Sequence, residues 1–189
     1  MRTSPTGSRR AFTLVELTVV VIILAVLATM IVPRLYSATG SARLRSSAGR
    51  LLVTARYARD YAATHRCDCW LMIDPAEDRY GLAYQQDPEH RPGEMLPLRA
   101  GIGKPERLGK GIRFSKVRIK PRHRGRGSTA EEQSGSIVFQ PAGRADAAVV
   151  EITDGKRKCS LLVAPNTGEA RLVEGAVSGL PDDRVDLDE

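Results

Sequence analysis

The longest hydrophobic run in this chain lies near its N-terminus. Residues 12–32 read FTLVELTVVVIILAVLATMIV, and Glu16 is the one ionisable residue among them. As an α-helix this run would be about 32 Å long, at about 1.5 Å per residue. That length matches the roughly 30 Å hydrocarbon core of a bilayer, so the run predicts a helix able to span a membrane.

A helical stripe of small and apolar residues follows the apolar block. Its members recur at alternating four- and three-residue steps, and several arginines lie off the stripe. The stripe consists of Leu44, Ala48, Leu51, Ala55, Ala58 and Ala62. Side chains this small predict close packing against a sheet or neighbouring helices. We therefore expect residues 34–66 to form the amphipathic second half of one long helix.

Short β-like runs, separated by turn residues, occupy the chain beyond Arg66. The predicted strands are 69–73, 80–84, 112–119, 136–140, 147–153, 158–164 and 170–173. The last four follow one another closely, as in an antiparallel meander. A helix followed by consecutive strands predicts an α+β fold.

Three further stretches complete the predicted organisation. Residues 85–111 are rich in Pro and Gly and 120–135 are strongly charged, so neither is expected to form regular structure. The antiparallel β domain is expected over 67–180. Residues 181–189 form an acidic tail, expected to be solvated.

Three interpretations of the N-terminal block compete. An ordinary secretory signal has an apolar core of about 7–15 residues, shorter than this run. A twin-arginine signal would use Arg9 and Arg10, but the run after them is very hydrophobic. The third interpretation is an anchor that the mature protein keeps.

Glu16 favours the retained anchor. A carboxylate inside an apolar stretch is costly and usually has a partner and a function. Cleavage before Phe12 would place a new ammonium group one helical turn from Glu16, where it can compensate the carboxylate. The competing view is that Glu16 lies near the membrane surface and snorkels to it.

The segment RRAFTLVEL, residues 9–17, resembles the class III signal of type IV prepilins and type II secretion pseudopilins. In that family the cut falls between a small residue, usually Gly, and a Phe that is then N-methylated. The resemblance implies a leader over 1–11, cleavage between Ala11 and Phe12, N-methylation of Phe12, and a role for Glu16 in filament assembly. Ala11 departs from the usual Gly.

Two further features resemble the same family. Pro33 resembles the helix-kinking proline of these stems, at the end of an assembly helix over 12–33. The stretches SIVFQPAGRADAAVVEI and KCSLLVAPNTGEARLV are similar to the C-terminal domain of the GspH/FimT group of minor pseudopilins. This implies a pilin-like fold, in which a long N-terminal helix packs on an antiparallel sheet.

The function implied by the resemblance is structural. The chain is expected to be a minor pseudopilin of a type II secretion system, held in the inner membrane by one span with its globular domain in the periplasm. Its implied partners are other pseudopilins or pilins, the prepilin peptidase and inner-membrane lipid. The alternative is a FimT-like minor type IV pilin that binds DNA during uptake.

Charge alone does not decide between these two functions. The formal net charge of +7 comes from 29 Lys and Arg against 22 Asp and Glu, and loss of the leader leaves 26 against 22. Residues 104–126, however, hold ten basic residues and one acid. An electropositive ridge of this kind binds phosphate backbones without reading sequence, although a solvated face is the default. Its candidate DNA-contacting residues are Arg113, Lys116, Arg118, Lys120, Arg122, Arg124 and Arg126.

Catalytic, metal and cofactor motifs are not expected. The three histidines occur in no acid–base or nucleophile motif, so we expect no enzyme and no cofactor. His65, Cys67 and Cys69 with Cys159 lack the usual zinc-ligand spacing, and no metal is expected. A disulfide between Cys69 and Cys159 is one reading of the cysteines, and three small buried apolar residues is the other.

Overall fold

The computed structural model describes residues 13–86, 95–99, 101–121 and 135–181, with the side chains of 28–39 left out. The chain divides into two compact units, Met1–Thr39 and Gly40–Glu189. One α-helix, α1 (Leu14–His65), contributes to both units. Each unit is considered by itself below.

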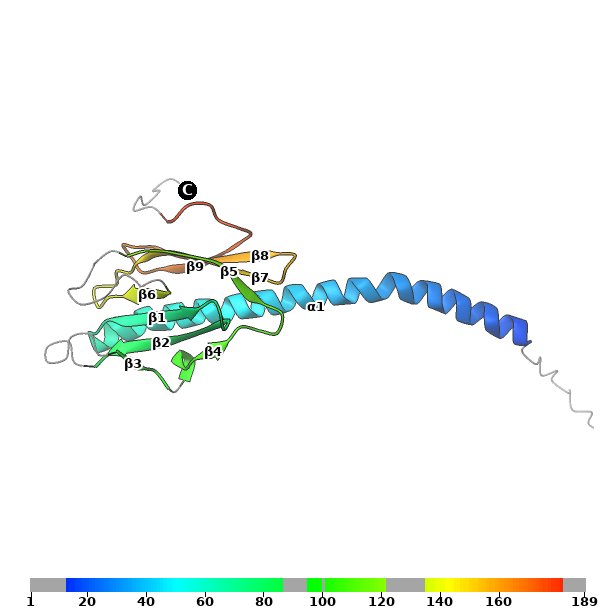
Figure 1. Ribbon diagram of the computed structural model, residues 1–189, viewed down its shortest axis with the longest axis horizontal. Helices are drawn as coiled ribbons and strands as arrows, with labels where there is room; N and C mark the ends of the chain where they lie inside the picture. Colours follow the sequence, from blue (N-terminus) through cyan, green and yellow to red (C-terminus); the bar gives the residue numbers. More distant parts are fainter. Residues whose placement is uncertain (1–12, 87–94, 100, 122–134, 182–189) are drawn as a thin grey trace, which may run out of the picture. The chain divides into compact units, whose positions relative to one another are not determined.

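Two antiparallel sheets form the second unit together with the C-terminal half of α1 (Figure 1). The first sheet has the order β3-β2-β1-β6, with β4 also paired to β2. Its strands are β1 (Cys69–Asp74), β2 (Arg79–Gln85), β3 (Met95–Pro97), β4 (Glu106–Arg107) and β6 (Ser136–Phe139). The second sheet has the order β5-β7-β8-β9. Its strands are β5 (Arg113–Lys120), β7 (Ala147–Thr153), β8 (Lys158–Val163) and β9 (Ala170–Glu174).

The predicted helical stripe is the side of α1 that faces the core. All six of its residues are at most 4% exposed, and Ala55, Ala58 and Ala62 are fully buried. They pack in one cluster with residues from both sheets, among them Leu71 and Leu161. Alanines at these positions let the sheet backbones approach the helix closely, as the step pattern predicts. The α+β fold, a helix packed on antiparallel sheets, is confirmed.

The two sheets bury their faces differently. Strand β1 alternates, with Leu71 and Ile73 buried toward α1 and Met72 exposed on the other face. Strand β7 is buried on both faces, including Glu151. The segment after β9 contributes to the second face of this sheet: the Gly175 carbonyl accepts a hydrogen bond from Ser160 Oγ at 2.7 Å.

The expectation of no regular structure over 85–111 is wrong. This stretch contains β3, β4 and a 3₁₀ turn, η1 (Gly101–Gly103). The free edge of β2 needs hydrogen-bond partners, and β3 and β4 supply them in two short pieces. Strands of two or three residues are too short to show an alternating pattern, which is why the sequence did not reveal them.

The predicted four-strand meander is also corrected. Strands β7, β8 and β9 do form one, but β6 joins the first sheet through β1. The chain turns tightly after Phe139, which forms an isolated bridge with Ala145, and then crosses to the second sheet. Of the loop predicted over 120–135, residues 122–134 lie outside the described part, as does 182–189 of the tail. The domain boundaries drawn from the sequence stay predictions.

Candidate functional site

The described part of the predicted assembly segment begins with a helix cap. The backbone amide of Glu16 donates a hydrogen bond to Thr13 Oγ1 at 3.2 Å, and the amide of Leu17 donates to the Thr13 carbonyl. Thr13 is therefore the N-cap of α1, and Glu16 occupies the third helical position. The Thr-x-x-Glu spacing is that of a capping box. The sequence contains this signal, although the helix was predicted only from the hydrophobic run around it.

Glu16 is also placed favourably for the helix dipole. It is the acidic residue of the first turn of α1, and it is exposed. A carboxylate there interacts favourably with the positive end of the dipole. The Thr13 cap and the Glu16 carboxylate therefore both lie at the start of α1.

The remaining residues predicted for processing and assembly are placed only in part. Ala11 and Phe12 lie outside the described residues, so cleavage and N-methylation stay predictions. Pro33 lies within α1, and a kink at that position stays a prediction. From Leu14 to Leu27 the large apolar side chains are between 42% and 79% exposed. Within the described part of the chain, no helix combines the length and apolarity needed to cross a membrane.

The predicted basic ridge lies on β5, at the edge of the second sheet. Arg113, Lys116 and Lys120 are exposed, whereas Arg118 is half-buried. A bulge between Phe114 and Lys116 lets the three cations share one face with Arg118 while Phe114 turns to the core. Arg122, Arg124 and Arg126 lie outside the described residues.

Arg118 serves a different purpose from the other basic residues of β5. Its guanidinium donates hydrogen bonds to the carbonyls of Val177 and Ser178, in the segment that follows β9. These two bonds attach the segment that follows β9 to β5, the edge strand of the second sheet. Arg118 is therefore less available for an external anion than Lys116 or Lys120.

The predicted disulfide between Cys69 and Cys159 is not formed, and all three cysteines are free and buried. Tyr61 lies close enough to Cys69 for the two groups to interact electrostatically. Arg45 and Glu174 are instead the charged neighbours that affect the pKa of the Cys159 thiol. Tyr61 and Arg45 lie sixteen positions apart on α1, about 24 Å at about 1.5 Å per residue. The two thiols therefore occupy different parts of the core.

The thiols fit the alternative reading, that of small apolar core residues. Burial raises the pKa of Cys69 to about 12, and the neighbouring Cys67 adds to that shift. Burial also raises the pKa of Cys67 and of Cys159. Protonated thiols are poor nucleophiles and poor metal ligands. Among the described residues, no group of three or more His, Cys, Asp or Glu is arranged to hold a metal ion.

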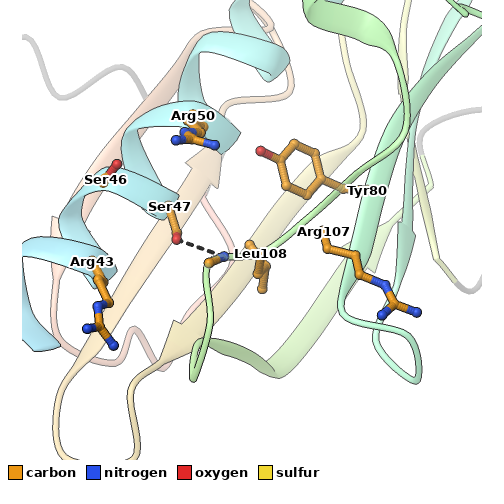
Figure 2. A pocket seen from close by; sticks show the side chains of 8 residues that line it. Arg43, Ser46, Ser47, Arg50, Tyr80, Arg107 and Leu108 are labelled. Carbon is orange, nitrogen blue, oxygen red and sulfur yellow. Dashed lines mark hydrogen bonds between the residues drawn. The ribbon is translucent and has the colours of Figure 1, made fainter.

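A cleft beside α1 was not anticipated from the sequence. One hollow of about 150 Å³ lies between α1 and the segment around β4 (Figure 2). In it, Ser47 Oγ accepts a hydrogen bond from the Gly109 amide at 3.2 Å. Figure 2 shows the Tyr80 ring reaching toward Arg50 and the Arg107 guanidinium pointing away from α1. Arg107 instead pairs with Glu77 at 2.7 Å.

A second hollow of about 400 Å³ shares Ser46 and Arg50 with the first. The two therefore adjoin, and together they are called the α1 cleft. Glu106 pairs with Arg50 at their junction. The lining of the second hollow comprises Ser46, Gly49, Arg50, Val53, Thr54, Gly101, Ile102, Lys104 and Glu106. Its residues come from α1 and from the 101–106 segment, which are too far apart in sequence for any pattern to join them.

Comparison with known proteins first defines the class of the N-terminus. Residues 7–32 match the family described as the prokaryotic N-terminal methylation motif. The match includes Thr13 and Glu16, the two residues of the helix cap. The chain thus has a prepilin-like N-terminus joined to an α+β domain. No curated protein matches the chain significantly.

The fold is that of a pseudopilin. Two solved structures of the minor pseudopilin EpsH from the type 2 secretion system of Vibrio cholerae resemble this chain. One has a TM-score of 0.51 at 11% identity, covering 70% of this chain and 97% of the EpsH chain in that structure. The other has a TM-score of 0.55 at 10% identity, covering 71% and 98%. At such low identity the likeness concerns the fold.

Proposed function

We propose that the chain is a minor pseudopilin of a type II secretion system, which assembles with other pseudopilins into a periplasmic pseudopilus. The observation that carries this proposal is the joint presence of the methylation motif and an EpsH-like fold in one chain. The motif accounts for export, processing and assembly. The fold, which matches nearly the whole length of the solved EpsH chains, accounts for the globular domain.

In this function the N-terminal segment is responsible for processing, membrane anchoring and filament assembly. A prepilin peptidase cuts between Ala11 and Phe12, which frees the Phe12 ammonium for N-methylation. The apolar residues after it hold the subunit in the inner membrane, with the globular domain in the periplasm. Glu16 then pairs with an ammonium inside the growing filament, because an unpaired carboxylate in an apolar setting is costly.

Processing provides the direct test. Co-expression of the full chain with a prepilin peptidase is expected to remove the residues before Phe12, a loss of about 1 kDa. Edman or mass analysis should find N-methylphenylalanine at the new terminus. Ala11→Trp should block the cut, and Glu16→Ala should leave it intact, since that side chain acts after cleavage. An unshifted wild-type band would contradict the proposal.

A minor type IV pilin that contacts DNA is the second candidate function. It is supported by the three exposed cations of β5, Arg113, Lys116 and Lys120. Phosphate contacts release counterions, so affinity falls with salt at a log–log slope of about 0.9 per contact on duplex DNA. Lys116→Glu with Lys120→Glu should therefore flatten the salt slope by about two contacts. Arg171→Glu, an exposed cation on β9, is the matched control. Absence of salt-dependent DNA binding would remove the support for this candidate.

A further inference from the structure

We infer that the α1 cleft is a docking surface for an acidic peptide segment that carries one bulky apolar side chain, presented by a neighbouring filament subunit. The identity of the partner rests on the proposed pseudopilin function. The chemistry of the ligand rests on the cleft itself, through its exposed apolar residues, its excess of cations over carboxylates and the rigidity of one wall.

Two apolar side chains stand open to solvent in the larger hollow. Val53 on α1 is 49% exposed and Ile102 in η1 is 51% exposed. They are the two most exposed large hydrophobic residues described in the second unit, ahead of Met95 and Met72. A single exposed apolar residue is ordinary, but two facing one hollow make a patch that a partner can cover.

The backbone around Ile102 holds that side chain outward. Gly101 adopts φ +68°, a conformation that L side chains rarely take. On the other side, a Cβ on Gly103 would lie 3.0 Å from Leu98 Cβ and 3.2 Å from Leu82. The turn is therefore pressed against the core at Gly103, and Ile102 has no inward place to go. Its exposure follows from the backbone.

The charges of the cleft specify an acidic ligand. Four cations line the two hollows, Arg43, Arg50, Lys104 and Arg107, and Glu106 is the one carboxylate. Arg50 pairs with Glu106, and Arg107 with Glu77. Arg43 and Lys104 have no ion-pair partner among the described residues, and they lie in different hollows. A ligand that spans the cleft meets Arg43 in the first hollow and Lys104 in the second.

Other ligands leave part of this surface unsatisfied. A free phosphate or a nucleic-acid backbone would pair with the cations but would leave Val53 and Ile102 in water. A purely apolar helix would cover these two residues while desolvating Arg43 and Lys104 without a partner, which is costly. An acidic segment with one central apolar side chain satisfies both, and its complementary charge also favours specificity.

Peptide binding to the full-length protein in detergent micelles tests the inference. The probe is a fluorescein-labelled peptide of sequence Asp-Asp-Leu-Asp-Asp, with Asp-Asp-Gly-Asp-Asp and Lys-Lys-Leu-Lys-Lys as controls and empty micelles as blank. Anisotropy should show saturable binding of the leucine peptide at low salt. The glycine peptide should bind at least about fivefold more weakly, about 1 kcal/mol, and the lysine peptide not at all.

Matched variants locate the binding. Ile102→Asp and Lys104→Glu should each weaken the leucine peptide by at least about fivefold. Met95→Asp and Arg171→Glu introduce the same acidic side chains at exposed positions outside the cleft, and should stay within about twofold of wild type. Thermal melts confirm that each variant folds, as expected for exposed sites.

Three outcomes would overturn the inference: no saturable binding, equal binding of the glycine peptide, or an equal loss in Arg171→Glu. The assay needs neither processing nor a filament. A chain that binds the peptide but is never cleaved by the peptidase would contradict the pseudopilin function and leave the cleft standing. A chain that is processed but fails this assay would contradict the cleft alone.

Discussion

The backbone amide of Glu16 lies 3.2 Å from the hydroxyl oxygen of Thr13, to which it donates the capping hydrogen bond of α1. One short stretch thus contains two devices. Thr13 fixes where the helix begins, and the Glu16 carboxylate is left for the dipole or for an ammonium. The two roles can be separated by mutation because different atoms carry them.

Filament assembly should depend on the carboxylate and far less on the cap. Glu16→Gln keeps the backbone bond to Thr13 and removes the charge, so incorporation into filaments should fall at least about tenfold while membrane association persists. Thr13→Ala should cost about 1 kcal/mol of local helix stability and leave assembly near wild type. Sheared-filament fractions, with membrane fractions as the loading control, measure both. Equal defects in the two variants would assign the effect to helix stability.

The alanine stripe of α1 leaves no room for larger side chains. Ala58 is fully buried between the helix and the sheets, and Arg56 on the opposite side is exposed. Ala58→Leu should lower the free energy of unfolding by about 1–3 kcal/mol through overpacking. Arg56→Leu, the same new side chain on the same helix, should change it by less than about 0.5 kcal/mol. Urea midpoints of the full chain in detergent give the comparison, and an unaffected Ala58→Leu would mean a loosely packed interface.

The stripe also shows which features of this fold a sequence can reveal. Periodicity identified the buried side of α1, and β-like runs between turn residues identified seven strands, because each of these elements is long enough to leave a local signal. Strands β3 and β4 are two or three residues long and exist because β2 has an edge to pair. Their positions depend on tertiary context, and no local pattern encodes it.

Of the candidate sites, some could be recognised in the sequence and others depend on the fold. Glu16 could be identified from the sequence because it is a single carboxylate within a hydrophobic run. The α1 cleft joins Val53 and Ile102, which are distant in sequence, and needed the fold. Arg118 belonged to a run of equivalent-looking basic residues until its bonds to Val177 and Ser178 set it apart.

The buried carboxylate of Glu151 should make Lys158 more valuable than an ordinary surface lysine. The Glu151 side chain is 4% exposed, and Lys158 Nζ lies 3.4 Å from it. Lys158→Ala leaves that carboxylate without this partner and should cost about 1–3 kcal/mol at neutral pH. Arg45→Ala, which breaks the largely exposed pair with Glu174, should cost less than about 0.5 kcal/mol.

The same pair predicts a rescue. Combining Lys158→Ala with Glu151→Gln removes the stranded charge, so the double variant should be more stable than Lys158→Ala alone. Chemical denaturation of the four proteins in the cycle gives the coupling energy. A coupling near zero would show that Glu151 is satisfied by its other neighbours, such as the facing Lys116 of β5.

Stability should decline at alkaline pH because buried acids ionise more easily once the chain unfolds. Burial is the main cause that raises the pKa of Cys69 and that of Tyr80, each to about 12, from ordinary values of 9.0 and 10.0. The folded state therefore holds both protons over a range in which the unfolded state releases them. The stabilising contribution is complete below about pH 8 and is lost progressively as pH rises toward 12.

The slope identifies the groups responsible. Each proton retained only by the folded state lowers stability by about 1.4 kcal/mol per pH unit within that range. Cys69→Ala with Tyr80→Phe should flatten the decline of the urea midpoint between pH 9 and pH 11, whatever the variant's stability at neutral pH. Between pH 6 and pH 7.5 the two proteins should change in parallel, because both groups keep their protons there in the folded and in the unfolded state. An unchanged alkaline slope in the double variant would mean that other groups govern the transition, and that these two side chains are as accessible to water in the folded chain as in the unfolded one.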